Sequence, residues 1–285
     1  MQPGRRIAFA LALPALGCTG AVSDPATADA ETARTTSAVV IVERTVDATS
    51  APRVETSARF ARVPLGTATR DALRTIGAAI DLPPPGSCAG IAALAGGAAG
   101  ATPVIELVDV GAVSLETSGR ETHLVPRQLP DVTDVVSGVV YARTADPALL
   151  PASARYLVRV SGSADVDAFE VAATAPADPA DVHIAGEDAT GVSVPAGAPI
   201  DVAWTPGAAD DSLYIEVQPA GFRCTLEDTA GGPGESAHAS VPASLVDEAG
   251  TLVVHRVHRE VLTARGLEAG EIRFDFSRSI AYLRR

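Results

Sequence analysis

Two histidines near the carboxyl end, His255 and His258, have a spacing that suggests metal chemistry. Imidazoles three residues apart share one face of a helix, where both could bind a single Zn²⁺ ion. The segment 251–257 alternates like a β-strand, however, and residues an odd number apart on a strand point to opposite faces. The chain also has neither an H-E-x-x-H motif nor a C-x-x-C pair. The sequence therefore predicts no metal site and no cofactor.

Acidic side chains gather at two places where carboxylate oxygens, the ligands that Ca²⁺ prefers, come close in sequence. These acids are Asp165, Asp167 and Glu170, together with Glu187 and Asp188. No loop of the EF-hand type contains them, so the sequence favours solvated loop acids. The pair Asp210 and Asp211 has the same interpretation, because aspartate is a common turn residue.

The residue types needed for several kinds of catalysis are missing. All 22 basic residues are arginine, which excludes a Schiff-base lysine and a lysine-containing phosphate loop. The G-x-S-x-G elbow is absent, and the five histidines stand in no recognisable catalytic context: His123, His183, His238, His255 and His258. A Ser/His/Asp triad stays possible because triads assemble from distant positions. The sequence predicts that the chain is not an enzyme and has no catalytic residue.

The 285 residues carry 35 acidic side chains and a formal charge of −13. Nucleic-acid affinity depends largely on basic residues that neutralise phosphates, so the charge excludes a nucleic-acid partner. The absence of asparagine also excludes N-glycosylation.

The amino terminus has the pattern of an export signal. Arg5 and Arg6 precede the apolar run Ile7–Leu16, which is much shorter than the roughly 20 residues that span a bilayer. The run ends in Ala15-Leu16-Gly17-Cys18, which resembles the lipobox of bacterial lipoproteins. That resemblance implies a signal peptide over residues 1–17 and a lipid on Cys18. The alternative is ordinary cleavage after residues 19–21, which would remove Cys18 with the signal.

The next residues predict a disordered tether over 18–37, because they are small and polar and could bury little apolar surface. In the lipoprotein family, a residue other than aspartate after the cysteine favours the outer membrane. Thr19 occupies that position. The resemblance thus implies a lipid-anchored protein of the bacterial cell envelope, held at the outer membrane.

Cys88 and Cys224 are the cysteines that remain after the signal. An exported compartment permits a disulfide, which would join the two halves of the chain. Alternatively, Cys224 is a buried thiol on the same strand face as Phe222 and Leu226. The sequence leaves both possibilities open.

Beyond the tether, alternation of apolar and polar residues indicates an all-β chain. Two prolines at 174–180 suggest a boundary between a β-rich domain at 38–176 and a β-sandwich domain at 181–285. The segment 69–80 alone looks helical, and the Ala/Gly run 89–101 predicts a flexible loop. Trp204 shares a strand face with Ile200 and Val202, so we expect it in a core.

Several segments resemble uncharacterised lipoproteins of the myxobacterial type. They are Asp201-Val-Ala-Trp-Thr-Pro-Gly207, Leu213-Tyr-Ile-Glu-Val217, Phe222-Arg-Cys-Thr225, Val241-Pro-Ala-Ser-Leu245, Thr251-Leu-Val-Val-His-Arg256, Gly266 to Asp275, Val136-Ser-Gly-Val-Val-Tyr141 and Val160-Ser-Gly-Ser163. The resemblance implies two β-sandwich domains like those of immunoglobulins or fibronectin type III, and it brings no catalytic motif.

Two functions follow as expectations. The first is a non-catalytic binding or structural module, anchored to the membrane by lipid, whose partner is a protein or an envelope polymer. The alternative is a lipid-anchored hydrolase of envelope polymers. Carboxylate pairs in a deep cleft would favour the hydrolase, whereas a surface without a cleft would favour the binding module.

Overall fold

The computed structural model describes residues 34–47, 50–96, 104–130, 136–188, 191–226 and 236–285. The predicted signal peptide and Cys18 lie outside the described residues. The first strand, β1 (Arg34–Asp47), begins inside the stretch predicted as tether. This part of the tether is structured because Arg34 to Ser37 pair in register with Pro64 to Ala61 of β2 (Arg53–Pro64).

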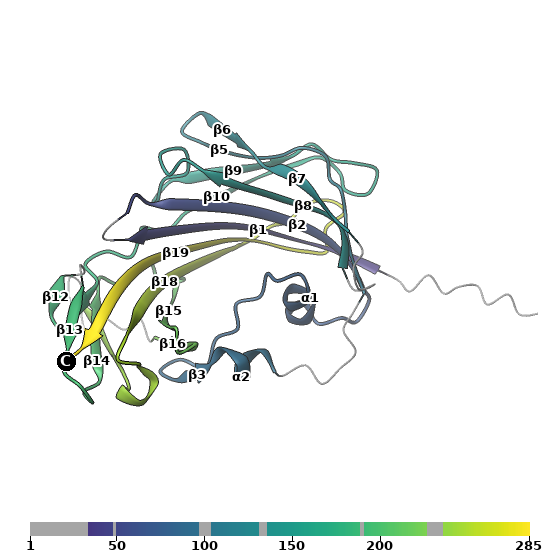
Figure 1. Ribbon diagram of the computed structural model, residues 1–285. Helices are drawn as coiled ribbons and strands as arrows, with labels where there is room; N and C mark the ends of the chain where they lie inside the picture. The colour runs from purple at the N-terminus through teal and green to yellow at the C-terminus, as the bar shows by residue number, and fades with distance from the viewer. Residues whose placement is uncertain (1–33, 48–49, 97–103, 131–135, 189–190, 227–235) are drawn as a thin grey trace, which may run out of the picture. The chain divides into compact units, whose positions relative to one another are not determined.

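Within the described residues, the largest sheet has 11 strands (Figure 1). Its order is β3 (Cys88–Gly90), β16 (Phe222–Thr225), β15 (Ser212–Gln218), β18 (Ala249–Val261), β19 (Ala269–Arg284), β1, β2, β4 (Ile105–Leu107), β8 (Val136–Ala145) and β7 (Val125–Leu129), with β13 (Val192–Val194) beside β19. The first and last long strands, β1 and β19, are parallel neighbours at its centre. Both ends of the described chain therefore meet in one sheet.

Two smaller sheets cover parts of the large one. The first has the order β10 (Phe169–Thr174), β9 (Arg155–Val160), β5 (Val113–Thr117) and β6 (Arg120–His123). The second has the order β12 (Glu187–Asp188), β11 (His183–Ile184), β14 (Ile200–Trp204) and β17 (Ala237–Val241).

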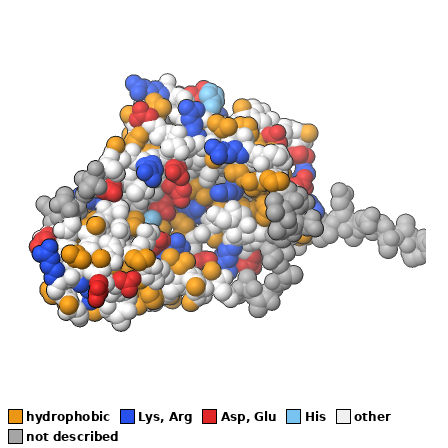
Figure 2. Space-filling model, viewed as in Figure 1, with side chains coloured by type: hydrophobic (Ala, Val, Ile, Leu, Met, Phe, Trp, Pro, Cys, Tyr) orange, Lys and Arg blue, Asp and Glu red, His pale blue; other side chains and the backbone are white. Residues whose placement is uncertain are grey.

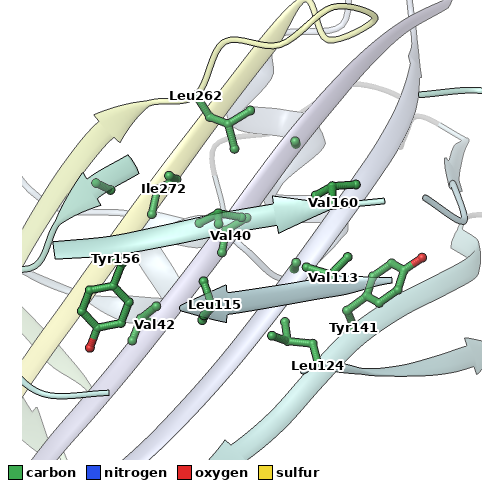
Figure 3. Close-up of a cluster of buried hydrophobic side chains, with 14 of the residues drawn as sticks. Val40, Val42, Val113, Leu115, Leu124, Tyr141, Tyr156, Val160, Leu262 and Ile272 are labelled. Atoms are coloured by element: carbon green, nitrogen blue, oxygen red, sulfur yellow. The ribbon is translucent and has the colours of Figure 1, made fainter. Parts of the chain in front are cut away.

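Two hydrophobic cores fill the space between these layers. The first contains Val40, Val42 and Ile272 of the large sheet and Leu115 and Tyr156 of the sheet β10-β9-β5-β6 (Figure 3). The second contains Trp204 and its neighbours on β14, packed against β15 and β18. Trp204 is completely buried, which confirms its predicted place in a core.

The all-β prediction is confirmed, and the layered packing fits a β-sandwich-like fold. The buried residues of the second core all follow the boundary predicted at 176–181, whereas the first core contains residues from both sides of it. β19 runs through both cores, with Phe274 in the first and Ile280 in the second. The described residues, from Arg34 onward, belong to one compact unit. The predicted boundary therefore does not separate two independent sheets.

The segment 67–95, here called the covering segment, lies over the face of the large sheet opposite the first core (Figure 1). It contains α1 (Thr69–Thr75), β3 and α2 (Ile91–Ala95). The helix is shorter than the predicted 69–80 because Gly77 has a φ of +66°. Part of the run 89–101, predicted as a flexible loop, is instead β3 and α2, because β3 pairs with β16.

A 3₁₀ turn, η1 (Ala243–Leu245), completes the described elements. No described helix has the length and apolar character needed to span a membrane.

Candidate functional site

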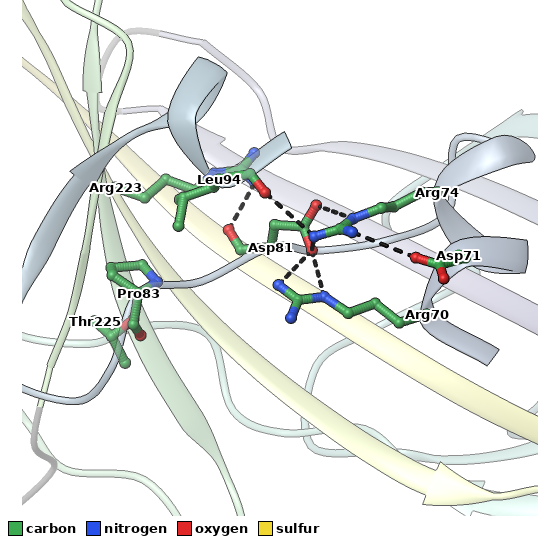
Figure 4. Close-up of polar contacts among 8 residues, drawn as sticks. All are labelled: Arg70, Asp71, Arg74, Asp81, Pro83, Leu94, Arg223 and Thr225. Carbon is green, nitrogen blue, oxygen red and sulfur yellow. Dashed lines mark hydrogen bonds and ion pairs between the residues drawn. The ribbon is translucent and has the colours of Figure 1, made fainter. Parts of the chain in front are cut away.

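The covering segment is fixed to the edge of the large sheet by charged and backbone contacts. Asp81 accepts hydrogen bonds from Arg70 Nε and Arg74 Nε, both at 2.8 Å, and its carbonyl accepts one from Arg223 of β16 at 3.4 Å (Figure 4). Burial raises the pKa of Asp81, but the two arginines outweigh it and hold that pKa below its usual value. The covering segment is therefore held in one place over the sheet.

Cys88 and Cys224 form a disulfide in the structure, across a sequence separation of 136 residues. They are direct partners in the antiparallel pair of β3 and β16. Of the two possibilities that the sequence leaves open, the structure has the disulfide. It joins the covering segment covalently to the second core.

The sheet face beneath the covering segment changes from apolar to polar along β1. Val39 and Ile41 are buried against Ala78 of the covering segment. The next residue on that face is Glu43, which lies in register with Asp275 of β19. A carboxyl pair on neighbouring central strands thus follows the apolar residues that pack against the covering segment.

Asp275 is the centre of a small hydrogen-bonded cluster. Its Oδ1 lies 2.7 Å from His255 Nδ1, and its Oδ2 accepts a hydrogen bond from the Tyr214 hydroxyl at 3.2 Å. The Tyr214 ring stacks on the His255 ring, with centroids 4.2 Å apart and planes 8° apart. These contacts fix the orientation of the imidazole.

Two pKa values in this cluster are displaced in the same direction. Burial, and then the Asp275 charge, raise the pKa of Tyr214 well above its ordinary value, so its hydroxyl stays a hydrogen-bond donor. Burial of the carboxyl group, and then the Asp275 charge, raise the pKa of Glu43, although part of its side chain is exposed to solvent. A positively charged ligand group beside Glu43 would offset this repulsion.

Two cavities meet at this cluster and share Glu43, His255 and Asp275 as lining residues. The larger, here called the acidic groove, has a volume of about 360 Å³. Four carboxylates, one arginine and several hydroxyl groups line it together with His255: Glu43, Asp47, Glu55, Asp275, Arg53, Thr45, Ser50, Ser277 and Ser279. The smaller cavity, of about 310 Å³, extends under the covering segment.

The acidic groove is a local feature of a mixed surface. Figure 2 shows side chains of both charges on the face in view rather than one broad patch of a single sign. The residues that line the groove therefore determine which ligand it can bind. Its carboxylates and hydroxyls suit a small ligand with positive charge and hydroxyl groups.

Residues singled out in the sequence lie in several places. His255 and His258 are on opposite faces of β18: His255 lines the acidic groove, and His258 contacts Asp211. Asp165 and Glu170 form ion pairs with arginines, and Asp167 lies 3.6 Å from Arg265. Glu187 and Asp188 form the short strand β12.

Sequence reasoning missed Glu43, Tyr214 and Asp275 as site residues. Glu43 follows a run of five buried residues, and Asp275 stands between two buried phenylalanines. An acid that interrupts an apolar strand in this way is the signal that could have marked both positions.

No protein-family model matches the chain, and no curated protein matches it. Among solved structures, the chain is similar to the Fcho1 Mu homology domain of Danio rerio with bound Eps15 peptide. The identity is 11%, the match covers 87% of this chain and 97% of that chain, and the TM-score is 0.27. A similarity of this size supports no conclusion about function.

Proposed function

We propose that the chain is a lipid-anchored cell-envelope protein that binds a small, cationic, hydroxyl-bearing ligand in the acidic groove. The observation that supports this most strongly is the shared wall of Glu43, His255 and Asp275 between two cavities. An amino sugar, as a soluble ligand or as a unit of an envelope polymer, has this chemistry. Its ammonium group would lie among the carboxylates, and its hydroxyls would bond to the serines and to His255.

Binding in the groove can be tested with glucosamine as the probe and N-acetylglucosamine as its uncharged control. We expect calorimetry on the full chain to detect glucosamine binding, with clearly weaker binding of the acetylated sugar. Glu43→Gln should weaken glucosamine binding about two- to fivefold, the range for a partly exposed ion pair. Glu248→Gln, an exposed glutamate outside the groove, should leave the affinity unchanged.

The affinity should also depend on pH through Glu43. A cation binds its ionised form, so affinity should be full above the pKa of Glu43 and decrease as the pH falls through it. Because that pKa is raised, the decrease should begin above the ordinary glutamate value of 4.5. Equal affinities for the two sugars, or no effect of Glu43→Gln, would contradict the proposed ligand class.

We propose that Cys18 holds the lipid anchor, at the outer membrane, as the Leu16-Gly17-Cys18 ending of the apolar run suggests. Metabolic labelling with a fatty-acid analogue should mark the wild-type chain and not Cys18→Ala. Equal labelling of the two chains would contradict the anchor while leaving the groove proposal untouched.

A hydrolase of envelope polymers is the second candidate, and the Asp275–His255 pair is the observation that favours it. A carboxylate on Nδ1 orients an imidazole as a general base. Ser277 faces His255 across β18 and β19, but its hydroxyl lies 3.1 Å from the Thr45 hydroxyl instead. Mass spectrometry of glucosamine oligomers incubated with the chain separates the candidates: intact oligomers indicate binding, and cleavage lost in His255→Gln indicates hydrolysis.

The two cores also support the predicted pair of immunoglobulin-like sandwiches, in a form that shares one long sheet. The presence of two separate cores supports this proposal, and the continuity of β19 through both limits the independence of the two units.

A further inference from the structure

A third cavity, of about 620 Å³, lies on the face of β18 opposite the acidic groove. His258 lines it together with two aspartates from the turn that precedes β15, Asp210 and Asp211. This cluster shares no lining residue with the acidic groove.

The three side chains offer metal-ligand atoms at suitable separations. His258 Nδ1 lies 2.9 Å from Asp211 Oδ1 and 3.7 Å from Asp210 Oδ2, and one ligand atom from each residue falls within 4.8 Å of the others. Bonds of about 2.0 Å in a tetrahedral Zn²⁺ site place neighbouring ligand atoms about 3.3 Å apart. We propose that Asp210, Asp211 and His258 bind a Zn²⁺ ion.

A carboxylate lies close to the other nitrogen of His258. Nε2 lies 3.4 Å from Glu260 Oε1, and that oxygen accepts a hydrogen bond from the Thr174 backbone at 2.7 Å. A histidine that binds a metal through one nitrogen usually donates its other N–H to a carboxylate, which fixes the ring. Glu260 is therefore the orienting residue of the site.

Asp211 is also held with one oxygen directed at His258. Its Oδ2 accepts a hydrogen bond from the Ala208 backbone at 3.1 Å, which leaves Oδ1 for His258. A Cβ atom at Gly207 would lie 2.5 Å from Oδ2, so only glycine admits the carboxylate here. Asp211 is 3% exposed and therefore has a single well-defined position.

Arg256, which is ion-paired with Asp211, gives a further indication that the cavity holds a ligand. Its side chain is 3% exposed, it lines the cavity, and its Nε has no hydrogen-bond partner among the described residues. Nε forms an ion pair with Asp211 Oδ2 at 3.8 Å, and the two terminal nitrogens of Arg256 donate to backbone carbonyls. A buried donor of this kind requires an acceptor. A water or an anion bound to the metal would supply one.

Three protein ligands leave a fourth coordination position, which is the arrangement of zinc sites that bind water or substrate. Here the fourth position would face the cavity, and Asp210, 69% exposed, gives the ion access from solvent. The imidazole nitrogen favours Zn²⁺ over Ca²⁺ or Mg²⁺, which prefer oxygen ligands.

The test uses the full chain with its disulfide intact and any free thiol alkylated. After dialysis against micromolar ZnCl₂, elemental analysis should find one zinc per chain, and the melting temperature should rise and fall again with EDTA. CaCl₂ at the same concentration should have no such effect. Absence of bound zinc, or an equal rise with calcium, would overturn the proposal.

Variants locate the site. Asp210→Asn, Asp211→Asn and His258→Gln should each weaken zinc binding by at least about tenfold, and Glu260→Ala by about tenfold. His238→Gln, an exposed histidine on β17, is the matched control and should bind zinc as the wild type does. If a variant of a buried residue does not fold, the exposed variant Asp210→Asn is sufficient to test the site. Unchanged zinc affinity in Asp210→Asn would overturn the site.

Discussion

Replacing Trp204 by alanine is expected to lower the free energy of unfolding by about 3 to 5 kcal/mol. The indole is completely buried in the second core, between β14 and the strands β15 and β18. Its removal loses the transfer free energy of a large apolar side chain and leaves a cavity that close-packed neighbours fill only in part. Equilibrium unfolding in urea, followed by circular dichroism, measures this loss.

Val261→Ala is the matched control for Trp204→Ala. Val261 belongs to the long strand β18 but is 78% exposed, so truncation there should change stability by no more than about 0.5 kcal/mol. A Trp204→Ala variant with the unfolding midpoint of the wild type would show that the indole is not part of the second core.

Removal of the disulfide is expected to have a second large effect on stability. In the chain-entropy model, a link across 136 residues stabilises the folded chain by roughly 4 to 5 kcal/mol. The double variant Cys88→Ala, Cys224→Ala should therefore unfold at a much lower urea concentration. The effect should reach the covering segment, whose strand β3 pairs with β16 at these two cysteines.

Dithiothreitol provides the control for this prediction. The reductant should lower the unfolding midpoint of the wild-type chain toward that of the double variant, and it should leave the double variant unchanged. A wild-type midpoint that does not respond to the reductant under unfolding conditions would contradict a disulfide between Cys88 and Cys224.

The local features of this fold could be predicted from the sequence because they depend on short-range patterns. Alternation along 200–204 placed Trp204 in a core, and alternation along 251–257 placed His255 and His258 on opposite faces. The length of the helix was overestimated, because Gly77 ends the turn that the apolar pattern would continue.

Long-range pairing could not be predicted in the same way. β1 and β19 lie side by side although they are at opposite ends of the described chain, and no local period encodes that contact. The shared sheet, and with it the carboxyl pair Glu43 and Asp275, follows from this pairing. Nothing in the sequence indicated that His258 and the pair Asp210 and Asp211 are neighbours, because Asp211 and His258 are 47 residues apart. The turn before β15 brings the two aspartates to His258.

The most direct test of the proposed function is to locate the ligand by nuclear magnetic resonance of the histidine side chains. The chain has five histidines, and the resonance that disappears in His255→Gln identifies the one in the acidic groove. Titration of the full chain with glucosamine should shift the His255 resonance in a saturable way, while those of the exposed His123 and His238 stay in place. A His255 resonance that does not move, or glucosamine-dependent shifts confined to other histidines, would contradict a ligand site at Glu43, His255 and Asp275.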